Sequence, residues 1–537
     1  MRRTAESQVW WEGDTGKLND YYLGHNTQAT HVGGTIAERA REAINVFWGR
    51  PTTASTTPMK RLHVPLGGVI PKLSATELFG EPLRVLSPDL VSTGKRPTPK
   101  AVKEDPLQVR SDLIFNTPRF HAELFTAGES ASALGGNFQR VVWDVSTGIE
   151  NAWIDFVDED RAIPEYKWGR LVAVTFWSEL EGSDGRVVWR WLQRYEPGRI
   201  VHGLYCGTGN DLGRAMPLTE HPATASLATQ VRADTDGYSY VETGIKELAA
   251  EYVPNVLPNP EWRHDPKLKY RGRADISTDG YPLLHELDRV YSSLMKDFRV
   301  GSARGIASSD LLQSKGAGQG LQLAEDQEFF TSLNPGVGAD GSMESMLQFY
   351  QPAIRVLEHD QGGDMLLRAL LQKTGYSPSS IGLSDEVAQT ATEVRGKKAR
   401  TIGTTSGKSR YWGAALGHIT TACLRIDAIK FPGKGVAPSE EMVIEWPNFA
   451  RESDLTKSQT LMNLRTAQAV STRTAVAYWH EDWDDDQIQE EVDEIDKANV
   501  MEPAFPTGPD QAPTSGDGAV PFAKKPETNP IDAPTEE

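Results

Sequence analysis

Two amphipathic segments separated by a long insertion constrain the fold of this chain more than any other feature. In the first segment, residues 281–298, apolar side chains recur at steps of three and four, which predicts a helix with one buried face. These side chains are Leu283, Leu284, Leu287, Val290, Tyr291, Leu294, Met295 and Phe298. A second helix is predicted through residues 365–371, ending at Gly375. Residues 301–356 are too many for an ordinary connection, so we expect them to form a small module.

The other face of the first segment is polar. Asp279 and Gly280 precede the helix and can cap it. We expect its solvent face to carry the charged residues Glu286, Asp288, Arg289, Lys296, Asp297 and Arg299.

Between Val141 and Tyr205 the apolar pattern changes to a period of two, which predicts strands. Residues 170–177 read as one strand, and Val187, Trp189 and Trp191 alternate with polar neighbours in the next. The tryptophans could stack a ligand, but such alternation is more often a half-buried sheet face. With helices also predicted after Pro65 and over residues 120–134, the fold class is α+β.

Residues 392–427 contain the densest positive charge in the chain and five glycines, which favour a kinked helix or two joined helices. Within them, the run from Gly403 to Gly407-Lys408-Ser409 approaches a phosphate-binding loop, but it is one residue short of G-x-x-x-x-G-K-[ST]. No apolar strand precedes it, as such a loop requires. A nucleotide-hydrolysing enzyme is therefore the weaker interpretation.

The remaining segments supply few chemical signals. Residues 1–45 are polar and read as an arm that packs against something else, whereas residues 91–106 read as a loop. A strand is predicted at 442–446 and helices near 454–469 and 485–499. The acidic run around Asp484 resembles a calcium loop, but Gln487 replaces its glycine, so these acids more plausibly begin a helix.

Composition excludes several classes of protein. The net charge of −18 opposes a protein that grips DNA over a basic face, although it fits one that DNA must pass without adhering. No segment approaches the about 20 apolar residues of a membrane span. Only two cysteines are present, and no Cys/His cluster has zinc spacing. Neither G-x-S-x-G nor H-E-x-x-H occurs, so we predict no enzyme, no catalytic residues, no metal and no cofactor.

Several segments, in order along residues 45–500, resemble portal proteins of long-tailed double-stranded-DNA phages, of the kind found in phages of actinobacteria. They are Arg61–Leu66 and Leu78–Pro82, Ile200–Tyr205, Gly272–Asp275 with Leu284–Asp288 and Tyr291–Asp297, Ala353–Val356 with Thr374–Pro378, and Thr390–Trp412. Their order and spacing carry the resemblance.

The resemblance implies a portal fold whose parts follow one another along the chain. It implies an N-terminal arm (1–45), a wing (46–280), a first stem helix (281–300), a clip (301–357), a second stem helix (358–376), a tunnel loop with a long wing helix (377–428), a helical crown (429–500) and a disordered proline-rich tail (501–537).

The resemblance also implies function and partners. Such a protein forms a homo-dodecameric ring at one capsid vertex of the virion after assembly in the host cytoplasm, and double-stranded DNA passes through it during packaging and ejection. Implied partners are the terminase, a head–tail adaptor, the major capsid protein and, as a further candidate, a scaffold protein, with no membrane. Candidates to line the DNA channel are Lys296, Arg299, Lys397, Lys398 and Arg400, and candidates for the tunnel loop are Leu383, Ser384, Asp385, Glu386 and Gln389.

Each basic candidate has a second interpretation, namely an ion pair with a neighbouring helix or subunit. Two other classes of protein also stay open. One is another ring-forming head–tail connector, although such proteins are generally much shorter. The other is an enzyme, either the nucleotide hydrolase or a hydrolase built on the tryptophan-rich sheet.

Overall fold

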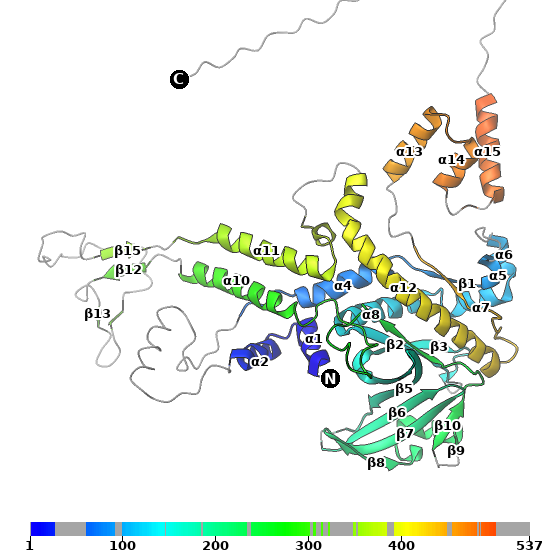
Figure 1. Ribbon diagram of the computed structural model, residues 1–537, viewed down its shortest axis with the longest axis horizontal. Coiled ribbons are helices and arrows are strands. Elements are labelled where there is room, and N and C mark those ends of the chain that lie inside the picture. Colours follow the sequence, from blue (N-terminus) through cyan, green and yellow to red (C-terminus); the bar gives the residue numbers. More distant parts are fainter. Residues whose placement is uncertain are drawn as a thin grey trace, which may run out of the picture. The chain divides into compact units, whose positions relative to one another are not determined.

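The structure is a computed structural model that describes residues 2–26, 61–91, 99–144, 147–183, 186–233, 238–300, 304–307, 313–314, 321–322, 347–350, 353–383, 391–447, 454–480, 483 and 485–500. The chain divides into two compact units, residues 1–463 and 464–537. Both helices and strands contribute, which confirms the α+β class (Figure 1). Among the helices in the described ranges, none is both long and apolar enough to cross a bilayer.

Most of the helices lie in the larger unit. They are α1 (Arg2–Glu12), α2 (Thr15–Asn26), α4 (Leu66–Phe79), α5 (Pro88–Val91), α6 (Pro99–Glu104), α7 (Pro106–Ile114), α8 (Pro118–Leu134), α9 (Pro222–Ala225), α10 (Tyr281–Val300), α11 (Val356–Thr374) and α12 (Ala391–Lys430). The helix α13 (Asp454–Thr466) crosses the boundary, and the smaller unit contains α14 (Thr472–Trp479) and α15 (Asp485–Val500). The predicted helices α4, α8, α10, α11, α13 and α15 are confirmed.

The largest sheet is antiparallel and has the strand order β4-β5-β6-β7-β10-β9, with β8 paired to β7 (Figure 1). Its strands are β4 (Ala162–Lys167), β5 (Arg170–Glu179), β6 (Val188–Glu196), β7 (Arg199–Thr208), β8 (Asp211–Met216), β9 (Arg232–Ala233) and β10 (Ser239–Glu242). The predicted strand at 170–177 and its hairpin partner are thereby confirmed. Most of β6 is half-buried, as the interpretation of a half-buried sheet face requires.

A three-stranded sheet, β11-β2-β3, joins this β-rich part to the helices; its strands are β2 (Gly136–Val142), β3 (Trp153–Asp158) and β11 (Ala250–Pro254). The strand β16 (Val443–Glu445), predicted from the sequence, pairs with β1 (Arg84–Leu86). The main core packs β2, β3 and β11 against α4, α8 and the second half of α12.

The helices α10 and α11 lie side by side and antiparallel (Figure 1). At one end Asp279 forms an ion pair with Lys373, and at the other end Arg355 lies 3.2 Å from Asp297. Between the two helices the chain forms the strand pairs β12 (Arg304–Ala307) with β15 (Leu347–Tyr350), and β13 (Gln313–Ser314) with β14 (Leu321–Gln322). The segment between the helices thus contains β structure of its own.

A second core, the helix-root cluster, fixes the base of this pair. Its buried members are Trp10, Leu18, Leu66, Ile70, Ile276, Tyr281, Leu284, Leu287, Leu370, Leu371 and Tyr376. At its centre the indole of Trp10 stacks on the ring of Tyr281, with ring centroids 6.2 Å apart. The aromatic N-terminal segment therefore packs on its own chain, through α1, α4 and α10.

Three other expectations need correction, and one helix was missed. The segment at 91–106 includes the short helix α6 and meets the end of α5, instead of forming only a loop. The sequence pattern missed α14, whose first residue follows the N-cap Ser471. The interpretation of 392–427 as two joined helices is wrong, because α12 is one continuous helix of 40 residues. The last correction concerns Asp288, which lies in the interior and not on the solvent face of α10. The tail at 501–537 lies outside the described residues.

Candidate functional site: buried ion pairs around the long helix

The lysine of the Walker-like run is buried. Lys408 lies on α12 with its side chain 3% exposed, and its Nζ is 2.8 and 2.7 Å from the two carboxylate oxygens of Asp275. Gly403 to Ser409 lie within the helix, so their backbone N–H groups are engaged along the helix axis instead of converging on an anion. The interpretation of this run as a phosphate-binding loop is therefore wrong for two reasons. The lysine is buried against a carboxylate, and the residues form a helix instead of a loop.

Four parts of the fold meet at this pair. Lys408 Nζ also lies 2.8 Å from Ser74 Oγ of α4 and 3.0 Å from the hydroxyl of Tyr376, which follows α11. Asp275 itself precedes α10. The pair thus ties the long helix to the base of both paired helices.

The carboxylate of Asp275 is satisfied by further donors. Asn255 Nδ2 donates to Oδ1 over 2.8 Å, and Ser132 Oγ of α8 donates to Oδ2 over 2.6 Å. Burial lowers the pKa of Lys408, and the Asp275 carboxylate opposes that effect. A buried pair that is this fully hydrogen-bonded fixes geometry, since removing either partner leaves an uncompensated charge.

A second buried pair fixes the first half of α10. His63 Nδ1 lies 3.0 Å from Asp288 Oδ2, and the backbone N–H of Val64 donates to Asp288 Oδ1 over 2.8 Å. These contacts hold the segment before α4 on α10. They explain why Asp288 is buried, because its carboxylate finds its donors inside the protein.

A third pair clamps the far end of α12. Arg110 of α7 donates to both oxygens of Asp427 over 2.8 and 2.9 Å, and the backbone N–H of Ala152 donates to Asp427 Oδ1 over 2.9 Å. Such bidentate guanidinium–carboxylate contacts fix orientation as well as distance. The helix α12 is therefore anchored near its middle by Lys408 and near its end by Asp427.

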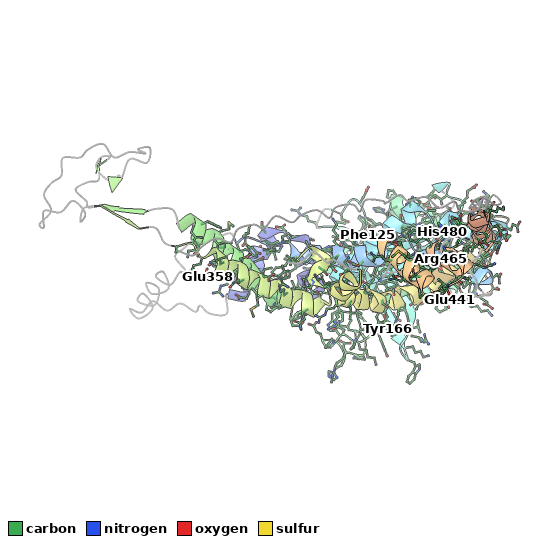
Figure 2. All side chains as sticks on the ribbon, turned by 90° about the horizontal axis from the view of Figure 1, so that it is seen from above. Phe125, Tyr166, Glu358, Glu441, Arg465 and His480 are labelled. Atoms are coloured by element: carbon green, nitrogen blue, oxygen red, sulfur yellow. The ribbon has the colours of Figure 1, made fainter. Side chains whose placement is uncertain are left out.

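The predicted DNA-channel residues fall in two places. Lys296 is exposed on α10, and Arg299 lies in the same helix, although its side chain is outside the described residues. Asp297, which lies between these two residues in the sequence, accepts hydrogen bonds from Arg355 and from His359 Nε2, which is 3.1 Å away. The ion pair that joins α10 to α11 at this end is therefore formed by the acidic residue Asp297. Figure 2 labels Glu358 in the first turn of α11, next to these contacts.

The other three basic candidates lie near the beginning of α12 and have contacts within the chain. Lys398 Nζ lies 3.9 Å from Glu77 of α4, and Arg400 Nη1 donates to the carbonyl of Gln372 over 3.3 Å. Lys397 is half-buried. Arg400 is nevertheless exposed, so its guanidinium stays accessible to a further partner.

The tunnel-loop candidates are described only in part. Leu383 is half-buried and packs against the helix-root cluster. Ser384, Asp385, Glu386 and Gln389 lie outside the described residues. Among the residues that the structure describes, no group of His, Cys, Asp and Glu side chains could hold a metal ion.

Sequence reasoning missed all three buried pairs. One signal was present for Asp288, because it lies four residues after Leu284 and three before Tyr291, at the spacing of the apolar face. Lys408 and Asp275 are 133 residues apart, and Arg110 and Asp427 are 317 apart, so no local pattern connects either pair.

No protein-family model matches the chain, and no curated protein matches it. Among solved structures, it is similar to a chain of "Neck of empty GTA particle computed with C6 symmetry", at 14% identity and a TM-score of 0.42, covering 80% of this chain and 94% of that one. It is also similar to a chain of "Neck of native GTA particle computed with C12 symmetry", at 13% identity and a TM-score of 0.40, covering 78% and 89%. A chain of "Virion of native gene transfer agent (GTA) particle" matches at 14% identity with a TM-score of 0.39, covering 80% and 94%.

Proposed function

We propose that this chain is a subunit of a portal ring, the head–tail connector through which double-stranded DNA enters and leaves a phage-like particle. The observation that carries the proposal is the antiparallel pair of α10 and α11, with β pairs in the chain between them and a single long helix after them. This is the order stem, clip, stem and long wing helix that the sequence resemblance implies. A ring of such subunits would place the paired helices around a central channel.

Exposed apolar side chains on the helix pair support a ring. Leu357 and Met365 of α11 are 72% and 74% exposed, and Met295 and Phe298 of α10 are also exposed. An isolated subunit leaves these groups in water, whereas a closed ring of head-to-tail contacts would cover them with the neighbouring subunit.

The buried ion pairs suit the same role. A channel wall must keep its shape while DNA is driven through it. Lys408 and Asp275 join the long helix to the base of the helix pair, and Asp427 fixes the other end of that helix. The net charge of −18 adds a second suitable property, since a subunit that is acidic overall gives DNA little of the counterion-release gain that makes binding tight.

The finer assignment follows from the resemblance. The ring contains twelve copies, lies at one capsid vertex of the virion after assembly in the host cytoplasm, and docks the terminase during packaging and a head–tail adaptor afterwards. Contact with the major capsid protein belongs to the same proposal, as does a structural role without turnover. Lys296, Arg299, Lys397, Lys398 and Arg400 remain the candidates that face the DNA.

Electron microscopy of the purified full-length protein tests the proposal. We expect class averages of rings with a central hole, and native mass spectrometry should give twelve times the subunit mass of 59.2 kDa. A protein that stays monomeric at micromolar concentration and physiological salt, or that hydrolyses a nucleotide, would contradict it.

A further inference from the structure

Trp168 lies at the tip of the β4–β5 hairpin and is 94% exposed. Lys167 pairs with Arg170 across the hairpin, so Trp168 and Gly169 form a two-residue turn. A tryptophan can bury about 150–250 Å² in a contact, and here nearly all of that area is in water. Among the described residues, none covers this side chain.

The backbone of Trp168 is also unfavourable for its residue type. Its φ of 53° lies in the left-handed region, where hairpin turns of this length favour Asn or Asp followed by Gly. A bulky side chain in that region is strained, and such strain concentrates where a residue has a function. Both the exposure of the indole and the left-handed backbone conformation are unfavourable for a tryptophan at this position. A contact with another molecule therefore explains the presence of Trp168 better than a role within the subunit.

The hairpin holds this side chain on a fixed support. The ring of Tyr166, which Figure 2 labels, packs on the ring of Tyr270 with centroids 4.8 Å apart. Lys269 Nζ lies 4.8 Å from the same Tyr270 ring. The backbone of the hairpin that carries Trp168 is therefore held in place, which lowers the entropy lost when the hairpin tip docks.

The same β-rich part contains a cavity of about 150 Å³, here called the sheet cavity. Its floor is one face of β6 and β7, where Trp191, Tyr195 and His202 line it, and its rim includes Trp143, Asp144 and Ser226. Cavities of about this size accept a benzene ring. The sheet cavity can therefore take the benzo ring of an indole.

The lining of the sheet cavity suits an indole chemically. Trp191 and His202 have ring centroids 5.8 Å apart and are nearly parallel, at 27°. Among the described residues, neither Trp191 Nε1 nor His202 Nδ1 has a hydrogen-bond partner, although His202 is only 8% exposed. Burial, helped by Arg140, lowers the pKa of His202 to about 4, so the ring is neutral and one nitrogen can accept a hydrogen bond.

Trp168 and the sheet cavity lie on different halves of one sheet. The hairpin forms the β4–β5 edge, whereas the cavity covers β6, β7 and β10 toward the other edge. A contact between them in two copies is head-to-tail, and such contacts close into rings when the rotation permits. The positive charges of Lys167 and Arg170, which flank the turn, also complement the negative charge of Asp144 on the rim of the sheet cavity.

We propose that Trp168 of one subunit inserts into the sheet cavity of the next, an inference that rests on the ring proposed above. The occupant of the cavity is thus a second copy of this chain.

Two single variants and their mixture test this contact in the full-length protein. Trp168→Asn removes the indole and places at the turn a residue that favours its backbone conformation. Ser226→Trp fills the cavity from its exposed rim. Leu212→Ala is the matched control, because Leu212 is an exposed apolar residue of the same sheet, in β8 close to the turn of the β7–β8 hairpin. Native mass spectrometry and electron microscopy give the assembly state, and circular dichroism monitors folding.

We expect each of the two variants to be a folded monomer and Leu212→Ala to form rings. Mixing Trp168→Asn with Ser226→Trp restores one contact only, so 1:1 dimers form and nothing larger. Rings of Trp168→Asn alone would overturn the contact while leaving the portal proposal intact. Wild-type filaments or other open polymers that Trp168→Asn abolishes would support the contact and overturn the portal. A monomeric wild-type protein would overturn both.

Discussion

Lys408 Nζ lies 2.7 Å from Asp275 Oδ2, although the two residues are 133 positions apart in the sequence. The contact converts a lysine that resembles a phosphate ligand into the link between α12 and the base of the α10–α11 pair. Both side chains are almost fully buried, so their attraction is weakly screened by solvent. Removing either side chain should therefore expose the other as an unpaired charge in the interior.

Replacing Lys408 with Met should destabilise the larger unit by about 3–5 kcal/mol, because Asp275 is left as an uncompensated buried charge. The measurement is the urea midpoint of the subunit by circular dichroism. Arg400→Gln, on the same helix but exposed, is the control and should change stability by at most about 0.5 kcal/mol. Equal midpoints for Lys408→Met and the wild type would contradict the structural role of the pair.

Alanine substitutions in α12 separate a helix from a phosphate-binding loop. At Gly403 and Gly407 an added Cβ meets nothing within 4 Å, so each change to Ala should stabilise the helix by up to about 1 kcal/mol. At Gly417 the Cβ would lie 2.7 Å from Glu441 Oε1 and 3.2 Å from the carbonyl of Met442, so the same change should stabilise less than at the other two positions, because these groups must shift. Thermal denaturation of the three variants measures the difference. A loss of stability at Gly403 and Gly407 would contradict the continuous helix.

The basic residues at the beginning of α12 test the DNA channel. Changing Lys397, Lys398 and Arg400 together to Gln should leave rings intact, because their contacts within the chain are partly exposed and contribute at most about 1 kcal/mol each. DNA packaging by those rings should fall, and the fall should be smaller at high salt, where phosphate contacts are already weakened. Electron microscopy and a packaging assay measure the two effects separately. Loss of rings would instead place these residues in a subunit interface.

How much of this fold could be predicted depended on whether a pattern was local. The helices α10 and α11 were predictable because their apolar positions recur at helical spacing and Gly375, with φ of 84°, ends α11. The continuous α12 was not, because its five glycines suggested breaks. Buried side chains of its second half, such as Trp412, Leu416 and Ile419, pack in the main core and outweigh that propensity.

The site was less predictable than the helices for the same reason. Charged residues are expected at the surface, so the pattern assigned Asp288 to the solvent face of α10. Only the tertiary structure supplies His63 and the Val64 N–H as its partners, from more than 200 residues away. The exposed Trp168 is the opposite case, since the strand pattern could not indicate that this tryptophan lies outside the sheet face, at the hairpin tip.

Glu159 provides a pH-dependent test of the β-rich part. Burial raises the pKa of its carboxyl to about 8, against the opposing effect of Arg271, whose Nη1 lies 3.6 Å away. In the folded state the group therefore keeps, between about pH 4.5 and 8, a proton that the unfolded state releases. Because the native state binds more protons in this window, the free energy of unfolding falls as pH rises.

Glu159→Gln should remove this dependence, since Gln is neutral at every pH and close to the protonated acid in shape. We expect the variant and the wild type to have similar urea midpoints at pH 5, and the variant to be the more stable at pH 8. Glu123→Gln, at an exposed ion pair on α8, is the control and should show no such divergence. In the opposite outcome, the stability of the wild type would increase relative to that of the variant as pH rises. That result would mean that Glu159 is ionised in the folded state and that its pairing with Arg271 outweighs the effect of burial.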